Sequence, residues 1–308
     1  MVVFSSYALQ VIMSFLMLAM IFMMLPRAQV SANRINEVLE TQSSIKDGNI
    51  TKNSKDEKGT VEFKNVCFKY PDADEYLLQN ISFKANKGDT VAFIGSTGSG
   101  KSTLINLVPR FYDATGGEVL VDGVNVKDYS LEYLHNKLGY VPQKAVMFNG
   151  TVTSNIEYGD NGKQKPTIEQ VKKAIEVAQG TEFVEKMDNS YNAHIAQGGT
   201  NISGGQKQRI SLARELVTPP RILVLDEPTS ALDVKTERII QKNVEALHCT
   251  RILVTHRLNT VEKADKILIM DNGKIIDYGN HHYLYKNNEH YCDLYDSYMN
   301  KYQEEEIK

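Results

Sequence analysis

The longest apolar stretch of the chain lies at its start, where residues 2–25 carry no charged side chain. A helix over this stretch would be about 36 Å long, which exceeds the ~30 Å hydrocarbon core of a bilayer. A signal peptide would instead have a basic start, a shorter apolar core and a small-residue cleavage site, and none of these is clear. The pattern favours a transmembrane helix over residues 1–26.

Basic residues occur only on the C-terminal side of this stretch, at Arg27, Arg34 and Lys46. Positively charged flanks of membrane helices stay in the cytoplasm. We therefore expect the bulk of the chain to face the cytoplasm.

Three polar residues, Ser6, Gln10 and Ser14, recur at every fourth position of the apolar stretch and share one helix face. Polar groups facing lipid are costly, so this face should contact other helices or a wet cavity. Hydrogen bonding between helices and a substrate path both fit the pattern.

The helical pattern continues beyond the membrane as far as about residue 40, with an apolar stripe on one side. Residues 41–59 are polar and of mixed charge, which is typical of a linker. We therefore expect a cytoplasmic helix extension and linker over residues 27–59, a globular domain over residues 60–300 and a tail over residues 301–308.

Within the globular domain, apolar runs typical of strands alternate with helical patterns, which predicts an α/β fold with crossover helices. The predicted strands cover residues 61–68, 81–85, 90–95, 222–226, 251–256 and 266–271. The predicted helices cover residues 101–110, 167–177, 205–216 and 235–247. Residues 167–184 are expected to form a helical insertion between the halves of the sheet.

Charge and cysteine content exclude some classes of partner and site. The net charge of −3 offers no basic surface for nucleic acid, so no nucleic-acid partner is expected. Cys67, Cys249 and Cys292 form no metal-type pair, and reduced thiols in a cytoplasmic domain are the simplest interpretation.

The segment GSTGSGKS, residues 95–102, is a complete phosphate-binding loop between an apolar strand and a helix. Its glycines let backbone amides converge on phosphate oxygens, Lys101 supplies positive charge, and the hydroxyl of Ser102 can ligate Mg²⁺. The strand ILVLD then delivers Asp226 to its C-terminal end, where it can hold the same ion, and Glu227 can polarise a water molecule. These residues predict a site for a nucleoside triphosphate.

A second candidate anion site lies in NISGGQKQR, where Ser203, Gly204 and Gly205 precede a helix. Two phosphate-binding helix starts so far apart in sequence suggest that each contacts a different nucleotide. Taken alone, the Ser-Gly-Gly segment could also be a flexible helix cap.

At this point the chain resembles the ATP-binding cassette (ABC) transporter family, from Thr60 to about Tyr298 and with the motifs in family order. GSTGSGKS and ILVLDE resemble the two Walker motifs, and ISGGQ stands where the family has LSGGQ. The resemblance implies a P-loop NTPase cassette with a RecA-like sheet core, an antiparallel β subdomain and a helical subdomain, preceded by one transmembrane helix.

The resemblance also implies roles for single residues. Tyr70 would stack on adenine, Asp233 in SALD would reach the other cassette, and His256 in VTHR would contact the γ-phosphate. Gln143 in YVPQ would contact magnesium and water and sense the membrane domain. The residues expected to bind ATP are Tyr70, Gly95, Ser96, Thr97, Gly98, Ser99, Gly100, Lys101, Ser102, Thr103, Ser203, Gly204, Gly205, Gln206 and Asp233. Those expected to act in catalysis are Glu227, His256, Gln143 and Lys101, with Ser102, Gln143 and Asp226 as Mg²⁺ ligands.

Several local segments, including LVPRFYDATGGEVLVDGVNV and MFNGTVTSNIEYGD, resemble exporter-type half-transporters. The first helix would then correspond to the last transmembrane helix of an exporter half, in a multi-pass protein of the plasma membrane with its cassette in the cytoplasm. The expected partners are a second half-transporter, in a homodimer or heterodimer, and a small-molecule, lipid or peptide cargo. Alternatives are a truncated ATP-binding fragment that transports nothing, a soluble ABC ATPase and an importer ATPase.

Two positions depart from the family pattern. Ile202 replaces the leucine of the signature, which is a near-isosteric change. Gln197 stands where exporters commonly have a glutamate, in the loop that would touch the membrane domain of the partner.

Overall fold

The structure is a computed structural model that describes residues 2–52, 58–158 and 165–306. It contains two compact units, Met1–Lys46 and Asp47–Lys308. Each unit is described below by itself.

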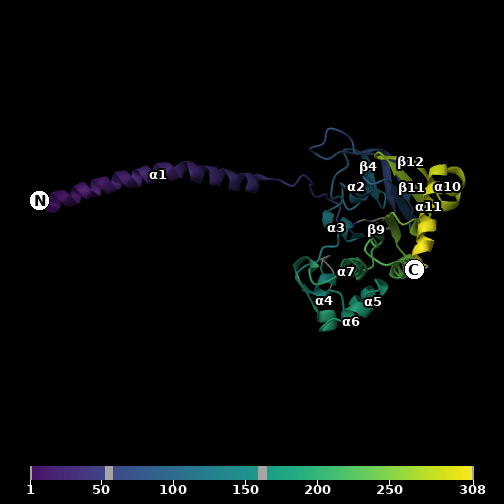
Figure 1. Cartoon of the computed structure of the whole chain (residues 1–308). Helices are drawn as coiled ribbons and strands as arrows, with labels where there is room; N and C mark the ends of the chain where they lie inside the picture. Colours follow the sequence, from purple (N-terminus) through teal and green to yellow (C-terminus); the bar gives the residue numbers. More distant parts are fainter. Residues whose placement is uncertain (1, 53–57, 159–164, 307–308) are drawn as a thin grey trace. The chain divides into compact units, whose positions relative to one another are not determined.

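The first unit is dominated by one helix, α1 (Val2–Glu40), which is continuous through Pro26 (Figure 1). By length and composition α1 can cross a membrane, with a mean hydropathy of 2.4 in its most apolar window and no buried side chain. Residues 2–25 of α1 expose large apolar side chains over most of the helix surface, which is typical of a helix in an apolar surrounding. The predicted helix and its extension to about residue 40 are therefore confirmed as one element.

The polar face of α1 satisfies part of its own hydrogen bonding. The hydroxyl of Ser6 donates to the carbonyl of Val3 at 2.9 Å, and that of Ser14 donates to the carbonyl of Gln10 at 2.8 Å. Such bonds to the preceding turn lower the cost of a hydroxyl in lipid. Of the three polar residues Ser6, Gln10 and Ser14, the two serines thus have a hydrogen-bond acceptor within the helix.

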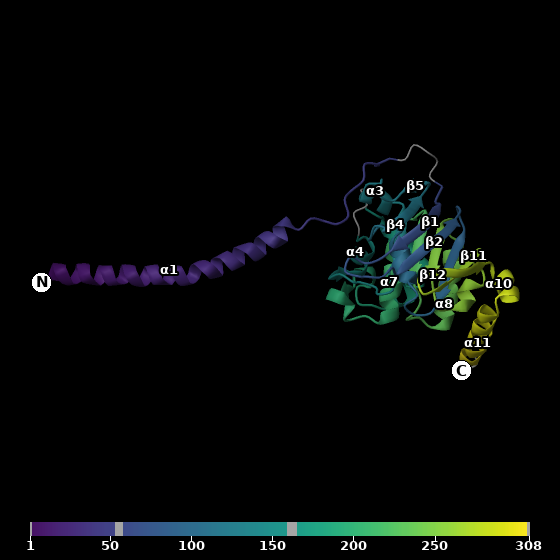
Figure 2. The same ribbon diagram turned by 90° about the horizontal axis from the view of Figure 1, so that it is seen from above.

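The second unit is built on a six-stranded sheet in the order β12-β11-β3-β10-β9-β6. Figure 2 labels β11 and β12, which lie at one end of this order. All neighbouring strands are parallel except β12, which runs antiparallel to β11. The strands are β3 (Thr90–Gly95), β6 (Leu138–Val141), β9 (Ile222–Asp226), β10 (Thr250–Val254), β11 (Lys266–Asp271) and β12 (Lys274–Gly279). Four of the predicted strands are confirmed here, whereas β6 and β12 were not predicted.

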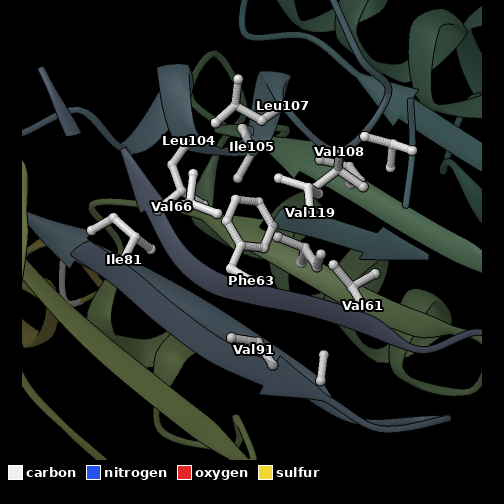
Figure 3. Packing of buried hydrophobic residues seen from close by; sticks show 14 of the residues in the cluster. Val61, Phe63, Val66, Ile81, Val91, Leu104, Ile105, Leu107, Val108 and Val119 are labelled. Atoms are coloured by element: carbon white, nitrogen blue, oxygen red, sulfur yellow. The ribbon is translucent and has the colours of Figure 1, made fainter. Parts of the chain in front are cut away.

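A second, antiparallel sheet has the order β2-β1-β4-β5. Its strands are β1 (Val61–Phe68), β2 (Leu78–Ala85), β4 (Gly116–Val121) and β5 (Val124–Asn125). The inward side chains of this sheet form one core with α2 (Lys101–Asn106) and one face of the larger sheet. Figure 3 shows Phe63 at the centre of this core, between Val66, Leu104, Ile105 and Val119.

The opposite face of the larger sheet is covered in two parts, because alternate side chains of each strand point to opposite faces. Leu223 and Leu225 of β9 pack into a core with α7 (Gly204–Leu216) and α8 (Val234–Glu245). Ala92 and Ile94 of β3 pack with the C-terminal helices. Those helices are α9 (Leu258–Val261), α10 (His281–Asn287) and α11 (Glu289–Glu306). A sheet covered on both faces explains the continuous apolar runs of its strands.

The predicted helical insertion is confirmed as a group of short helices, which Figure 1 shows together on one side of the domain. It contains α4 (Val152–Ile156), α5 (Ile168–Val177), α6 (Thr181–Glu185) and the 3₁₀ turns η1 (Ser190–Asn192) and η2 (Gln197–Gly199). A small ribbon of β7 (Gly150–Thr151) and β8 (His194–Ile195) closes it, and α3 (Leu131–His135) lies before β6.

The helix predicted for residues 101–110 ends earlier, at Asn106. Pro109 restricts the residue before it, and Arg110 adopts a left-handed conformation with φ of 59°. Both features are incompatible with another regular helical turn.

The middle of the predicted linker is attached to the globular unit. The amides of Gly48 and Ile50 donate to the carbonyls of Tyr129 and Asp128, at 3.0 and 2.9 Å. The carboxylate of Asp47 accepts from the amide of Leu131 at 2.6 Å. Residues 47–50 are therefore part of the folded domain, although their composition is that of a linker.

Candidate active site

Four loops meet at one edge of the larger sheet because parallel strands place their C-terminal ends together. β3, β10, β9 and β6 are consecutive neighbours in this sheet. They are followed respectively by the predicted phosphate loop, His256, Glu227 and Gln143. Residues separated by more than 150 positions are thus brought to a single site.

The phosphate loop needs glycine at two positions where its backbone lies very close to neighbouring strands. Gly95 has φ of 147°, and a side chain there would meet the backbone carbonyl of Met270 on the neighbouring strand. Gly100 has φ of 96°, and a Cβ atom there would lie 2.8 Å from the side chain of Leu78. Glycine is the one residue that combines these angles with these contacts at no steric cost. The loop is therefore a defined structure, set tightly against two strands.

The ammonium of Lys101 is held inside this loop. It donates to the carbonyls of Gly95 and Ser96, at 2.9 and 2.7 Å, and to the hydroxyl of Ser99 at 3.3 Å. Burial lowers the pKa of Lys101, and the nearby carboxylates of Glu227 and Asp226 partly oppose this. A desolvated ammonium with carbonyl partners gains from an anionic ligand, which fits a lysine that binds phosphate.

Asp226 lies directly beside the loop, where its carboxylate accepts a hydrogen bond of 3.1 Å from the hydroxyl of Ser102. Asp226 is 4% exposed, and burial raises its pKa although the bond from Ser102 acts in the opposite direction. A divalent cation would relieve this cost, and hydroxyl and carboxylate oxygens are ligands that Mg²⁺ prefers. Among the described residues no group of three or more His, Cys, Asp or Glu side chains could hold a metal. The paired hydroxyl and carboxylate oxygens of Ser102 and Asp226 fit a Mg²⁺ ion that takes its remaining ligands from phosphate and water.

Glu227 is the centre of the site. Its two carboxylate oxygens lie 3.1 Å from Nε2 of Gln143 and 3.0 Å from Nε2 of His256. Its backbone has φ of 48°, and its amide donates to the carbonyl of Val254 on β10 at 2.9 Å. The strained backbone, the strand contact and the two side-chain partners together hold the carboxylate in one place. Gln143, Glu227 and His256 are therefore a contiguous polar group.

Tyr70 lies against the helix that follows the phosphate loop. Its hydroxyl is 3.0 Å from the hydroxyl of Thr103, and its ring makes edge-to-face contacts with Phe68 and Tyr112 at 5.0 and 5.2 Å between centroids. This placement is compatible with a platform for a base next to the phosphates. Adenine stacking on Tyr70 stays a prediction.

The second predicted anion site caps α7. The hydroxyl of Ser203 accepts from the amide of Gln206, and the side chain of Gln206 accepts from the amide of Ser203, which is a capping box. Among the described residues, no hydrogen bond joins residues 203–206 to the phosphate loop of the same chain. In the described part of the chain, the two predicted phosphate sites are thus not joined by a hydrogen bond.

Asp233 caps the next helix, α8, by accepting from the amide of Thr236 at 2.9 Å. This hydrogen bond lowers the pKa of Asp233. The side chain therefore has a structural role in its own chain, and its predicted contact with another cassette would be an additional one.

Comparison with known proteins identifies this arrangement. Residues 78–230 match the family described as ABC transporter, a range that contains the phosphate loop, the signature segment and Asp226. The chain belongs to the ABC transporter family. Its globular unit is the ABC cassette, which binds nucleotide.

Two relatives and one solved structure that resemble this chain are each about twice its length. An uncharacterized ABC transporter ATP-binding protein of Bacillus subtilis is 39% identical over 95% of the chain and 50% of that protein. An ATP-dependent lipid A-core flippase of Haemophilus influenzae is 45% identical over 77% of the chain and 40% of the flippase. The solved structure of a bacterial Atm1-family ABC exporter with ATP bound superposes with a TM-score of 0.82. The two sequences are 33% identical, and the superposed region covers 91% of this chain and 49% of the exporter. The chain spans about half the length of the curated relatives it matches.

The two positions that depart from the family pattern are both accommodated in the ABC cassette. Ile202 packs partly buried against the core beneath α7. The side-chain oxygen of Gln197 accepts from the amide of Asn149 at 3.3 Å, a bond that a glutamate could also make. The change at Gln197 therefore removes charge without removing this contact.

Sequence reasoning missed Gln208, which joins the signature helix to the SALD segment. Its side chain donates to the hydroxyl of Ser230 at 2.8 Å and accepts from the amide of Ala231 at 2.9 Å. Gln208 is buried, and a polar residue on the apolar side of a predicted helix was the available signal.

Proposed function

We propose that this chain is the ATP-hydrolysing part of an ABC exporter, with α1 as the last transmembrane helix of an exporter half and the cassette in the cytoplasm. The observation that carries the proposal is the position of Glu227, whose carboxylate contacts both Gln143 and His256 beside the Asp226–Ser102 pair. A candidate base, a group that can stabilise negative charge and a cation site thus lie together at the C-terminal ends of the parallel strands.

In this proposal Glu227 orients the attacking water and accepts its proton, while Gln143 holds that water in place. Lys101 and His256 stabilise the charge that develops on the transferring phosphoryl group. Asp226, Ser102 and Gln143 would hold Mg²⁺, which neutralises the phosphate oxygens when bound. Catalysis would rest on positioning and electrostatics, as is general for phosphoryl transfer.

We further propose that hydrolysis takes place in a head-to-tail dimer of cassettes. Each ATP would lie between the phosphate loop of one chain and residues 203–206 of the other. In the described part of one chain no hydrogen bond joins these two segments, which is compatible with a composite site. The partner would be a second exporter half, identical or homologous.

The membrane part of the proposal rests on α1 and on the relatives. α1 is long and apolar enough to span a bilayer, and the relatives include a lipid flippase and a structurally characterised exporter. We propose that ATP-driven closure and opening of the cassettes moves a small molecule, lipid or peptide across the plasma membrane. Gln197 and the segment around Asn149 would lie where the cassette meets the membrane part of the partner.

The experiment that tests the catalytic assignment is Glu227→Gln. Removal of the base should lower ATP turnover by roughly 10²–10⁴-fold. ATP-dependent dimers should accumulate at the same time, because a negative charge next to the phosphates is also lost. Glu182→Gln, which changes an exposed carboxylate on α6, is the matched control and should turn over ATP normally. Near-normal turnover in Glu227→Gln would overturn the assignment.

A further inference from the structure

A buried carboxylate on α8 connects several loops of the site without being part of it. Glu237 is 1% exposed, and its side chain lies beneath the segments that follow β9 and β10. Burying a carboxylate is costly unless charged and hydrogen-bonding partners surround it. The partners of Glu237 therefore indicate what the residue holds.

The first partner is Arg257, which follows His256 directly in the chain. One guanidinium nitrogen of Arg257 pairs with Oε2 of Glu237. Another donates to the backbone carbonyl of Leu232 at 3.0 Å. Because Leu232 precedes Asp233, the side chain of Arg257 connects the loop of His256 to the SALD loop.

The other partners are two threonines on the remaining oxygen. The hydroxyls of Thr229 and Thr260 both lie 3.4 Å from Oε1 of Glu237. Thr229 is two residues beyond Glu227, and Thr260 belongs to α9, which begins just after Arg257. One carboxylate thus contacts groups that flank Glu227 and His256 and, through Arg257, the loop of Asp233.

We propose that Glu237 and Arg257 are positioning residues, which hold the loops of Glu227, His256 and Asp233 in one fixed arrangement. Their ion pair keeps the His256 ring 3.0 Å from Glu227 and ties that distance to the position of the SALD loop. The proposal rests on the function proposed above, because it takes Glu227 and His256 as the groups that act on ATP.

A purely stabilising role explains the arrangement less well. Replacing a buried ion pair with apolar side chains is often neutral or stabilising, so such a pair is weak evidence of a need for stability. Here Thr229 and Arg257 lie within two residues of Glu227 and His256, and Thr260 belongs to the α9 turn that follows His256. The remaining group, the carbonyl of Leu232, directly precedes Asp233. The pair thus connects loops of the candidate site instead of two remote surfaces.

The test compares Glu237→Gln and Arg257→Lys with the exposed-site control Glu182→Gln in the dimeric, membrane-embedded protein. Glu237→Gln keeps the shape of the side chain but loses the charge. Arg257→Lys keeps the charge, but a single ammonium cannot contact Glu237 and Leu232 at the same time. The side chain of Arg257 is 23% exposed, so the domain can accommodate this substitution without unfolding. A displacement of about 1 Å at a catalytic group can cost up to ~10²-fold in rate. We expect kcat to fall at least about tenfold in both variants, with KM for ATP within about twofold of the unaltered protein.

A double variant separates positioning from general destabilisation. If Glu237 acts through His256, then Glu237→Gln should have no further effect on kcat in a His256→Ala background. A full additional tenfold loss in that background would overturn the proposal, as would normal kcat in Arg257→Lys. If Glu227→Gln abolishes turnover while Glu237→Gln and Arg257→Lys leave it intact, this inference fails and the proposed function stands. If Glu227→Gln itself turns over ATP normally, the proposed function fails first.

Discussion

One carboxylate makes the cassette less stable as the pH rises. Glu215 lies near the end of α7 and accepts a hydrogen bond of 3.2 Å from the amide of Tyr140 on β6. Burial raises its pKa from 4.5 to about 7, although the bond from Tyr140 and the charge of Arg214 oppose the shift. The folded state therefore binds a proton that the unfolded state releases between these two values. The resulting penalty is small below pH 4.5, grows as the pH rises and is complete above pH 7.

The size of this effect follows from the shift. A difference of one in pKa between the folded and unfolded states corresponds to about 1.36 kcal/mol. With a pKa of 4.5 in the unfolded state and about 7 in the folded state, Glu215 lowers the free energy of unfolding by ~3 kcal/mol at pH 8 and by ~1 kcal/mol at pH 5. Glu215→Gln removes the titration and keeps an oxygen for the amide of Tyr140. We therefore compare the free energy of unfolding of the variant with that of the unaltered protein at each pH. This difference should be about 2–3 kcal/mol larger, in favour of the variant, at pH 8 than at pH 5.

Urea unfolding of both proteins at pH 5 and pH 8 measures this difference, because all other titrations cancel at each pH. Glu182→Gln is the control. The neighbouring Lys186 lowers the pKa of that exposed carboxylate, so it is ionised at both pH values and its substitution should have the same effect at each. An equal change in stability at pH 5 and pH 8 for Glu215→Gln would refute the reasoning.

Two further substitutions test other parts of the domain. Asp122→Ala removes the acceptor of three backbone amides and the buried partner of Lys137 at 3.0 Å, so urea unfolding should show a loss of about 3–5 kcal/mol. A loss below 1 kcal/mol would contradict the role of this cluster in attaching the start of β1 to the core. Asp226→Asn removes the charge beside Ser102, so the Mg²⁺ concentration for half-maximal ATPase activity should rise at least about tenfold. An unchanged Mg²⁺ dependence would remove Asp226 from the ion site.

Much of the fold and the site follows from local sequence. Four strands have the predicted bounds, because the pattern of apolar residues and the length of each apolar run are visible in the sequence. These strands cover residues 61–68, 90–95, 222–226 and 266–271. The phosphate loop and Asp226 meet because each follows a buried parallel strand, which the sequence makes visible. The proximity of Ser102 and Asp226 was thus within reach of sequence reasoning.

Other features depend on contacts that no local pattern reveals. β6 is only four residues long and contains a glycine, so its signal is weak, yet its pairing with β9 places Gln143 beside Glu227. Glu237 has the composition of an exposed helix position and is buried because the loops of Arg257, Thr229 and Thr260 fold over it. Residues 47–50 are mostly polar, and they are attached by hydrogen bonds to the backbone of a segment about 80 residues away. In each case the deciding partner lies far along the chain.

The most direct test of a composite ATP site mixes two variants that are each inactive alone. Lys101→Ala disables the phosphate loop, and Ser203→Arg blocks the signature segment at an exposed helix cap whose loss costs only ~1 kcal/mol. In a mixed dimer, the intact phosphate loop of one chain faces the intact signature of the other. ATPase activity should then return to about a quarter of the unaltered value, because half of randomly formed dimers contain one complete site. A mixture that stays inactive, while fluorescence energy transfer shows that the two variants have paired, would contradict the claim that ATP is hydrolysed between two chains.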